Sequence, residues 1–227
     1  TDPDLAACDP PCFMIELAPM TADLQTAPRV AAIILAAGGS LRMGQPKQLL
    51  PIGDRPMVRR VVEAACSAGL EQVVVVVGAH AASVKQALTG LQVDIVVNTA
   101  WLSGMSSSLR LGLAALRPEI QAALIVLADQ PGLTPDLLRL LVARYDNTSA
   151  PIVAPYYQGQ RGNPVLFDRS LFGELLRLEG DRGGRTVITS HSDLLERAYV
   201  DDPAVILDVD TLPDYKRAKG AGPACDS

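Results

Sequence analysis

Short apolar runs without polar alternation, separated by segments of helical spacing, constrain the fold of this chain more than any other feature. The clearest run is five consecutive valines at residues 73–77. β-Branched residues in an unbroken apolar run suit a strand that is covered on both faces, as in a parallel sheet. Comparable runs predict three further strands, at residues 30–35, 93–97 and 122–127.

Segments of helical spacing lie between these strands. We expect helices over residues 56–68, 82–88, 105–116 and 134–145. In the last of these, Thr134 followed by Pro135 is typical of a capped first turn. Repeated strand–helix units predict an open α/β sheet with right-handed crossovers, and such sheets bind ligands at the carboxyl ends of their strands.

The pattern changes after residue 156. The turn-rich segment 158–162 predicts a hairpin connection, and therefore a small antiparallel insert in a mostly parallel sheet. Further elements are expected to be short, with strands at residues 163–167, 198–200 and 204–207 and helices at residues 168–178, 185–190 and 214–219.

The composition limits the class of protein. With 227 residues, 48% of them hydrophobic, the chain can bury one sizeable core. We expect a single domain over residues 29–220, between a flexible N-terminal tail (1–28) and a C-terminal tail (221–227). A net charge of −5 and an aromatic content of 4% argue against a nucleic-acid partner. No apolar run approaches the length of a membrane span, and four cysteines without a disulfide framework favour the cytoplasm.

A glycine-rich loop follows the first predicted strand. Its small residues let backbone N–H groups approach a phosphate chain, and Arg42 and Lys47 supply two cations to meet the phosphate charge. The loop is neither a Walker A motif nor a dinucleotide fingerprint, because both spacings are absent. The predicted nucleotide-binding residues of this segment are Leu35, Ala36, Ala37, Gly38, Gly39, Ser40, Arg42 and Lys47.

Aspartates are placed to bind a metal ion. Asp129 follows the strand at residues 122–127, over the expected cleft, and magnesium prefers one or two carboxylates together with phosphate oxygens and water. Asp208 and Asp210 project to the same side of an extended segment, so either of them could complete a Mg²⁺ site with Asp129.

Two motifs carry a resemblance to a known family. Residues 35–47 match every fixed position of the pattern Leu-Ala-Ala-Gly-x-Ser-x-Arg-Met-Gly-x-x-Lys, and residues 128–131 read Ala-Asp-Gln-Pro. From about residue 30 to about residue 219, the chain resembles the molybdenum cofactor cytidylyltransferase branch of the MobA-like NTP transferase family. The resemblance implies a three-layer, Rossmann-like nucleotidyltransferase fold. It also implies Mg²⁺-dependent transfer of CMP from CTP to the phosphate of a molybdopterin-type cofactor, with release of pyrophosphate.

The same resemblance assigns roles to individual residues. It implies that Arg42, Lys47 and Asp129 are catalytic. It favours Asp210 over Asp208 as the second metal ligand beside Asp129, although Leu212 and Pro213 replace the Pro and Glu of the family's closing motif. Further nucleotide contacts are implied for Ser106, Ser107 and Ser108, and acceptor contacts for Arg161, Asn163, Asp181 and Arg185. The implied partners are CTP, the molybdopterin-type cofactor, and a molybdenum hydroxylase or its chaperone.

Three alternatives stay open. The first is the same chemistry, with GTP or CTP, on another phosphorylated acceptor. The second is a nicotinamide-dependent oxidoreductase, because relatives with this loop act on pigment-like heterocycles; the missing dinucleotide fingerprint counts against it. The third is a carrier that delivers the cofactor without catalysis, and the presence of Arg42, Lys47 and Asp129 argues against that.

Overall fold

The computed structural model describes residues 27–40 and 43–220, and its core is one eight-stranded sheet. The strands follow the order β10-β7-β9-β6-β1-β4-β5, and β8 pairs with β7. Their bounds are β1 Val30–Ala36, β4 Gln72–Val77, β5 Asp94–Val97, β6 Ala122–Leu127, β7 Ile152–Tyr157, β8 Gln160–Arg161, β9 Val165–Asp168 and β10 Leu195–Tyr199. A separate hairpin joins β2, Pro51–Ile52, to β3, Arg55–Pro56.

The sheet is mostly parallel, as the sequence predicts. Strand β1 pairs in parallel with β4 on one side and β6 on the other, so Ile33 lies opposite both Val74 and Ile125. Strand β9 runs antiparallel to its neighbours β6 and β7, while β10 returns parallel to β7. The antiparallel insert is therefore β9 together with the short strand β8, which turns back on β7.

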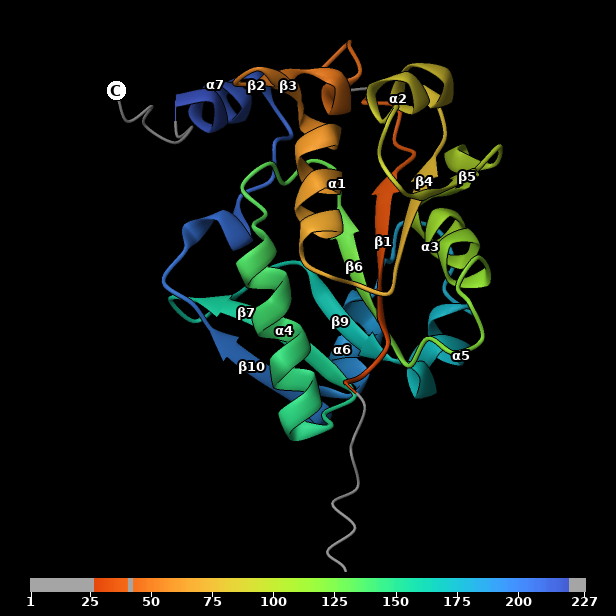
Figure 1. Ribbon diagram of the computed structural model, residues 1–227, viewed down its shortest axis with the longest axis vertical. Coiled ribbons are helices and arrows are strands. Elements are labelled where there is room, and N and C mark those ends of the chain that lie inside the picture. Colours follow the sequence, from red (N-terminus) through yellow and green to blue (C-terminus); the bar gives the residue numbers. More distant parts are fainter. Residues whose placement is uncertain (1–26, 41–42, 221–227) are drawn as a thin grey trace, which may run out of the picture.

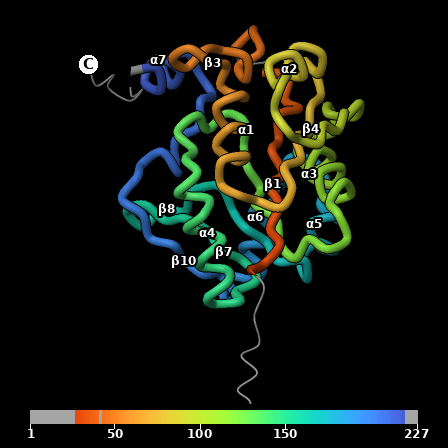
Figure 2. Tube along the Cα trace, viewed as in Figure 1, coloured from red at the N-terminus to blue at the C-terminus, as the bar shows by residue number. Residues whose placement is uncertain are grey.

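Helices cover both faces of this sheet and make three layers (Figures 1 and 2). Their bounds are α1 Met57–Ser67, α2 Ala81–Ala87, α3 Met105–Ala114, α4 Pro135–Thr148, α5 Phe172–Leu175, α6 Arg185–Ser190 and α7 Leu212–Gly220. Helices α1 and α4 lie in front of the sheet in Figure 1, and α6 lies behind it. None of the helices in the described part of the chain is long and apolar enough to cross a bilayer.

The five valines explain why two cores are possible. Val73, Val75 and Val77 belong to the cluster that α1, α2 and α4 complete. Val74 and Val76 belong to the cluster on the opposite face, with α3, α5 and α6. Since alternate side chains of a strand point to opposite faces, an unbroken valine run supplies both cores at once.

Two predicted elements differ in the structure. The strand expected at residues 204–207 is a 3-10 turn, Pro203–Ile206, because Pro203 starts it and the Asp202 carboxylate accepts the Ala204 N–H at 2.8 Å. The helix expected at residues 168–178 is shorter, with a 3-10 turn capped by Asp168 before α5. The predicted cap of α4 is confirmed, since Thr134 Oγ1 accepts the Leu137 N–H.

Candidate active site

The glycine-rich loop, residues 37–47, begins where β1 ends and is held by close backbone packing. A Cβ on Gly78, after β4, would lie 2.6 Å from the Ala37 carbonyl oxygen, and a Cβ on Gly39 would lie 2.8 Å from Cζ3 of Trp101. The Ala79 N–H donates to that same Ala37 carbonyl at 3.1 Å. Small residues are therefore required here because two strand ends and an indole ring meet without space for side chains.

Polar contacts within the loop involve a glutamine that the sequence reasoning did not select. Gln48 is only 3% exposed. Its Nε2 donates to the Gly38 carbonyl at 2.6 Å, and its Oε1 accepts the Ser40 hydroxyl at 3.0 Å. The Lys47 N–H in turn donates to Ser40 Oγ at 3.0 Å. Arg42 lies outside the described residues, so its predicted role stays a prediction.

Lys47 joins two carboxylates from distant parts of the chain. Its Nζ lies 2.7 Å from Oδ2 of Asp129, which follows β6, and 2.7 Å from Oδ1 of Asp210, which precedes α7. Burial alone lowers the pKa of Lys47, but the charge of Asp129 and the hydrogen bonds to both carboxylates outweigh it, so the net pKa is raised. The ammonium of Lys47 is therefore charged and sits where the two carboxylates converge.

These carboxylates fit a divalent cation that also takes ligands from a substrate. Asp129 Oδ1 is buried and has no hydrogen-bond partner among the described residues. Within residues 27–40 and 43–220, no group of three or more His, Cys, Asp or Glu side chains could hold a metal. Two carboxylates plus phosphate oxygens and water make a donor set of the kind Mg²⁺ prefers, and an unpaired buried carboxylate oxygen is suited to that role.

Asp208 occupies a different position from Asp210. The Gln130 side chain, 2% exposed, donates from Nε2 to Asp208 Oδ1 at 2.6 Å. Burial raises the pKa of Asp208, and the negative charges of Asp129 and Asp210 raise it further, against the hydrogen bond from Gln130. Asp210 thus contacts Lys47, whereas Asp208 is held by Gln130 beside the carboxylates of Asp129 and Asp210.

The start of α7 forms a cap despite its departures from the family motif. The Asp214 carboxylate accepts the Thr211 N–H at 2.8 Å, and the Asp214 N–H donates to Thr211 Oγ1 at 3.3 Å. This reciprocal pair is a capping box, and it orients the turn that carries Asp210.

The predicted serines are buried at the start of α3. Asn98 Nδ2, after β5, donates to Ser107 Oγ at 2.8 Å and to Ser108 Oγ at 2.9 Å. The Ser106 hydroxyl is buried and has no partner among the described residues. Two of the three predicted nucleotide contacts therefore already bind within the protein, and Ser106 is the one whose hydroxyl is unpaired there.

The four predicted acceptor residues line one cavity of about 620 Å³, which we call the arginine cavity. Its walls include Arg161, Asn163, Asp181, Arg182, Arg185 and Asp208, together with the apolar side chains Ile125, Leu127, Val165, Phe167 and Ile188. Burial and the nearby positive charge of Arg185 lower the pKa of Arg161. Two unneutralised guanidinium groups facing one cavity favour an anionic ligand.

Backbone contacts explain how this cavity is built. Gly162 packs against η5, the 3-10 turn Pro203–Ile206, where a Cβ would lie 2.5 Å from the Val205 carbonyl oxygen, and the Asn163 N–H donates to that carbonyl at 2.8 Å. The Asp181 carboxylate accepts the Met105 N–H at 3.1 Å, so it caps α3 as well as lining the cavity. The segment that leads to Asp208 is thereby fixed to the acceptor side of the site.

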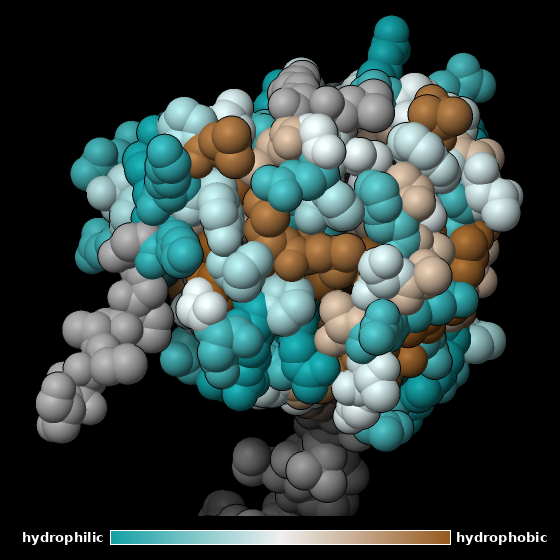
Figure 3. All heavy atoms as spheres, turned by 90° about the horizontal axis from the view of Figure 1, so that it is seen from above, coloured by the Kyte–Doolittle hydropathy of each residue, from teal (hydrophilic) through white to brown (hydrophobic). Residues whose placement is uncertain are grey.

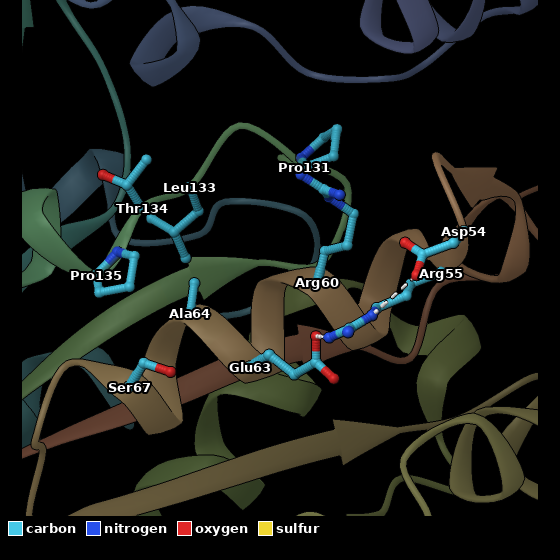
Figure 4. Close-up of a pocket in the computed structure, with 10 residues that line it drawn as sticks. All are labelled: Asp54, Arg55, Arg60, Glu63, Ala64, Ser67, Pro131, Leu133, Thr134 and Pro135. Carbon is cyan, nitrogen blue, oxygen red and sulfur yellow. Dashed lines mark hydrogen bonds and ion pairs between the residues drawn. The ribbon is translucent and has the colours of Figure 1, made fainter. Parts of the chain in front are cut away.

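A second cavity of about 620 Å³ lies apart from these residues (Figure 4). It is bounded by α1, the β2–β3 hairpin and residues 131–135. Along one wall, Arg55 Nη1 and Glu63 Oε2 form an ion pair of 2.6 Å, so these two charges neutralise each other. None of the predicted site residues lines it.

From above, the face where the strands end shows apolar side chains in its middle, bordered by hydrophilic ones (Figure 3).

Comparison with known proteins identifies the family. The model of the MobA-like NTP transferase domain matches residues 32–194. Nicotine blue oxidoreductase of Paenarthrobacter nicotinovorans is 34% identical over 202 residues, which cover 84% of this chain and 96% of that protein.

Solved structures agree with this match. Rv0371c from Mycobacterium tuberculosis H37Rv is 35% identical with a TM-score of 0.77, over 86% of this chain and 100% of that one. Its complex with manganese is 33% identical with a TM-score of 0.74, over 85% and 99%. The chain therefore belongs to the MobA-like NTP transferase family and is a nucleotidyltransferase of Rossmann-like fold.

Proposed function

We propose that this protein transfers CMP from CTP to the terminal phosphate of a molybdopterin-type cofactor and releases pyrophosphate. One observation carries the proposal: the Lys47–Asp129–Asp210 cluster and the arginine cavity adjoin at Asp208, which faces both. A cationic loop for a nucleotide and a cationic cavity for a second anion are the two parts that phosphoryl-type transfer between two substrates needs.

The nucleotide side consists of the glycine-rich loop and the carboxylate pair. Backbone N–H groups of Gly38, Gly39 and Ser40 approach the phosphates, with Arg42 and Lys47 as the opposing cations. Asp129 and Asp210 would hold the divalent metal, and the existence of a manganese complex of Rv0371c supports the use of a divalent cation. Bound Mg²⁺ supplies positive charge to the phosphate oxygens.

Two features of the arginine cavity support a second substrate that carries a phosphate and a flat ring. Arg161 and Arg185 meet no carboxylate among the described residues, which leaves their charge available to an anion. Phe167, Ile125 and Ile188 provide an apolar surface in the same cavity. A phosphorylated heterocycle would place its phosphate at the arginines and its ring against the apolar side chains.

The residues then act mainly by position and charge. A phosphate oxygen of the acceptor attacks the α-phosphorus of CTP in line, the new P–O bond forms, and the bond to the pyrophosphate oxygen breaks. Lys47 and Arg42 offset the charge that develops on the α-phosphate and on the leaving pyrophosphate. The acceptor phosphate is already an anion, so the step needs no general base.

Pyrophosphate release tests the proposal directly. The purified protein is incubated with Mg²⁺, a molybdopterin-type acceptor, and CTP, GTP, ATP or UTP in turn. Release with CTP is the expected result; the preference for CTP over GTP rests on the Ala36-Ala37-Gly38 and Ala-Asp-Gln-Pro motifs. Release only with GTP would keep the reaction and overturn the choice of nucleotide, and release with nucleotide but another phosphorylated acceptor would overturn the choice of cofactor.

A second candidate function follows from the relative in Paenarthrobacter nicotinovorans, whose name describes an oxidoreductase acting on nicotine blue. The apolar wall of the arginine cavity suits a pigment-like heterocycle as well as a pterin. Oxidation of NADH or NADPH in the presence of such a dye, with no pyrophosphate release from any nucleotide, would favour that function.

A further inference from the structure

Gln48 has no assigned role, yet it directly follows the glycine-rich loop, is only 3% exposed and bonds to two residues of that loop. We infer that Gln48 is a positioning residue that sets the shape in which the loop meets the nucleotide phosphates. The inference rests on the proposed nucleotidyl transfer and names the residue that preorganises its nucleotide side.

Both the oxygen and the nitrogen of the Gln48 amide form hydrogen bonds with the loop. Nε2 donates to the Gly38 carbonyl at 2.6 Å, and Oε1 accepts the Ser40 hydroxyl at 3.0 Å. A glutamine amide offers a donor and an acceptor on one rigid plane, so a single side chain fixes two loop residues relative to each other.

The hydrogen bond from Ser40 to Gln48 helps to stabilise an unusual backbone conformation at Ser40. Its φ of +53° lies in the left-handed region, which non-glycine residues occupy only when their surroundings hold them there. Its hydroxyl donates a hydrogen bond to Gln48 Oε1, and its oxygen accepts the Lys47 N–H at 3.0 Å. The hydroxyl is therefore engaged in the loop itself, and the loop presents its backbone N–H groups to the phosphates.

The charge cluster joins this network at the backbone of Lys47, whose N–H donates to Ser40 Oγ. The Lys47 ammonium itself contacts Asp129 and Asp210, whereas the Gln48 amide bonds to Gly38 and Ser40. Removing the Gln48 amide leaves the Gly38 carbonyl and the Ser40 hydroxyl without their partner, while the cation and its two carboxylates stay in contact. Removal of the Gln48 amide is therefore expected to weaken nucleotide binding.

Trp101 reports on the loop directly. It is the only tryptophan of the chain, and its ring packs against Gly39, between the two residues that Gln48 grips. A change in loop shape alters the surroundings of that ring, so the emission spectrum of the protein reads out the loop before any nucleotide is added.

The test compares Gln48→Met and Gln48→Glu with wild type. Methionine keeps the volume and removes both hydrogen bonds, whereas glutamate keeps an acceptor for Ser40 and loses the donor to Gly38. The measurement is the Kd for CTP with Mg²⁺, from titration of Trp101 emission and from calorimetry. We expect binding of CTP to weaken by about tenfold or more in both variants, with a shifted Trp101 emission in the free proteins.

Gln72 provides the matched control. It is also buried, 5% exposed, and its Nε2 donates to the Ala115 carbonyl at 3.0 Å, at the opposite end of the sheet. Gln72→Met removes that bond together with the bonds of the same amide to Asp94 and to the Arg117 N–H, so it lowers the unfolding temperature. It should leave the Kd for CTP within about twofold of wild type. Weakened CTP binding in Gln72→Met as well would reduce the Gln48 effect to general destabilisation and overturn the inference.

Ser40→Ala keeps the test decisive if Gln48→Met does not fold. It removes the other half of the same bond, and combined with Gln48→Glu its effect on the Kd is less than additive. CTP binding within about twofold of wild type in the Gln48 variants would overturn the inference alone and leave the proposed function standing. Wild-type protein that binds none of the four nucleoside triphosphates would overturn the proposed function, and the inference with it.

Discussion

Lys47 and Asp129 form an ion pair of 2.7 Å across 82 residues of sequence, at the point where β1 and β6 end side by side. Because Asp210 meets the same ammonium, Lys47 stands between the two carboxylates proposed to bind the metal. In the proposed function the ammonium is both a cation for the nucleotide and a neutralising partner for the two metal-binding carboxylates, and substitution can separate these two roles.

Turnover depends on the charge of Lys47. In Lys47→Ala we expect kcat to fall by about hundredfold or more, because the opposing charge is lost where the α-phosphate reacts. The Kd for CTP should change far less, since the loop amides remain. Steady-state kinetics and calorimetry measure the two effects, with Lys85→Ala on α2 as the surface control. Equal turnover in Lys47→Ala and wild type would remove Lys47 from the mechanism.

In the absence of nucleotide, the affinity for a divalent metal should rise when the Lys47 ammonium is removed. Lys47→Met removes the ammonium that Asp129 and Asp210 share, so the attraction of this carboxylate pair for a divalent cation rises. We expect Mn²⁺ to bind about tenfold more tightly to Lys47→Met than to wild type, as measured by the signal of free Mn²⁺ in electron paramagnetic resonance. Adding Asp129→Asn should abolish the gain; a gain that survives would place the metal elsewhere.

The acceptor should depend on the arginine cavity and the nucleotide should not. Arg161→Gln and Arg185→Gln each remove a guanidinium that lines the cavity. We expect the KM for the acceptor to rise by about tenfold or more in each variant, with the KM for CTP unchanged. Arg139→Gln, on α4 and paired with Asp136, is the control. A parallel rise in both KM values would show that the cavity serves the nucleotide.

Acid stability tests a contact remote from the site. Tyr145 Oη donates to Asp168 Oδ2 at 2.5 Å. Burial raises the pKa of Asp168, but hydrogen bonds from Ser170 and Tyr145 outweigh it and lower the pKa below the usual value of 3.8. The lowered folded-state pKa stabilises the protein above 3.8, and that contribution is lost as the pH falls from 3.8 through the folded value.

Tyr145→Phe therefore weakens stability most at neutral pH. We expect it to lower the free energy of unfolding by about 1–3 kcal/mol at about pH 7. The deficit should shrink below about pH 4, where Asp168 becomes protonated in both proteins. Urea unfolding across this pH range measures it, with the exposed Tyr199→Phe as control. A deficit that stays constant down to low pH would show that Asp168 is not the partner that matters.

Much of the fold follows from local sequence. The valine run at residues 73–77 predicts β4 and its burial on both faces, and Thr134-Pro135 predicts the start of α4, because side-chain branching and capping act within a few residues. The strand expected at residues 204–207 was wrong, because Asp202 and Pro203 form a capped 3-10 turn there, a signal that the apolar pattern conceals.

The sequence by itself determined the strand–helix order, the strand-end positions of Gly38 and Asp129, and, through the family motifs, four of the residues that line the arginine cavity: Arg161, Asn163, Asp181 and Arg185. Only the tertiary structure decided that Asp210 meets Lys47 while Asp208 meets Gln130, and that Gln48 holds the glycine-rich loop. Two of these contacts join residues 163 and 78 positions apart. Spacing along the chain determines a helix face or a strand face, but contacts at such separations exist only once the sheet has brought its strand ends to one edge.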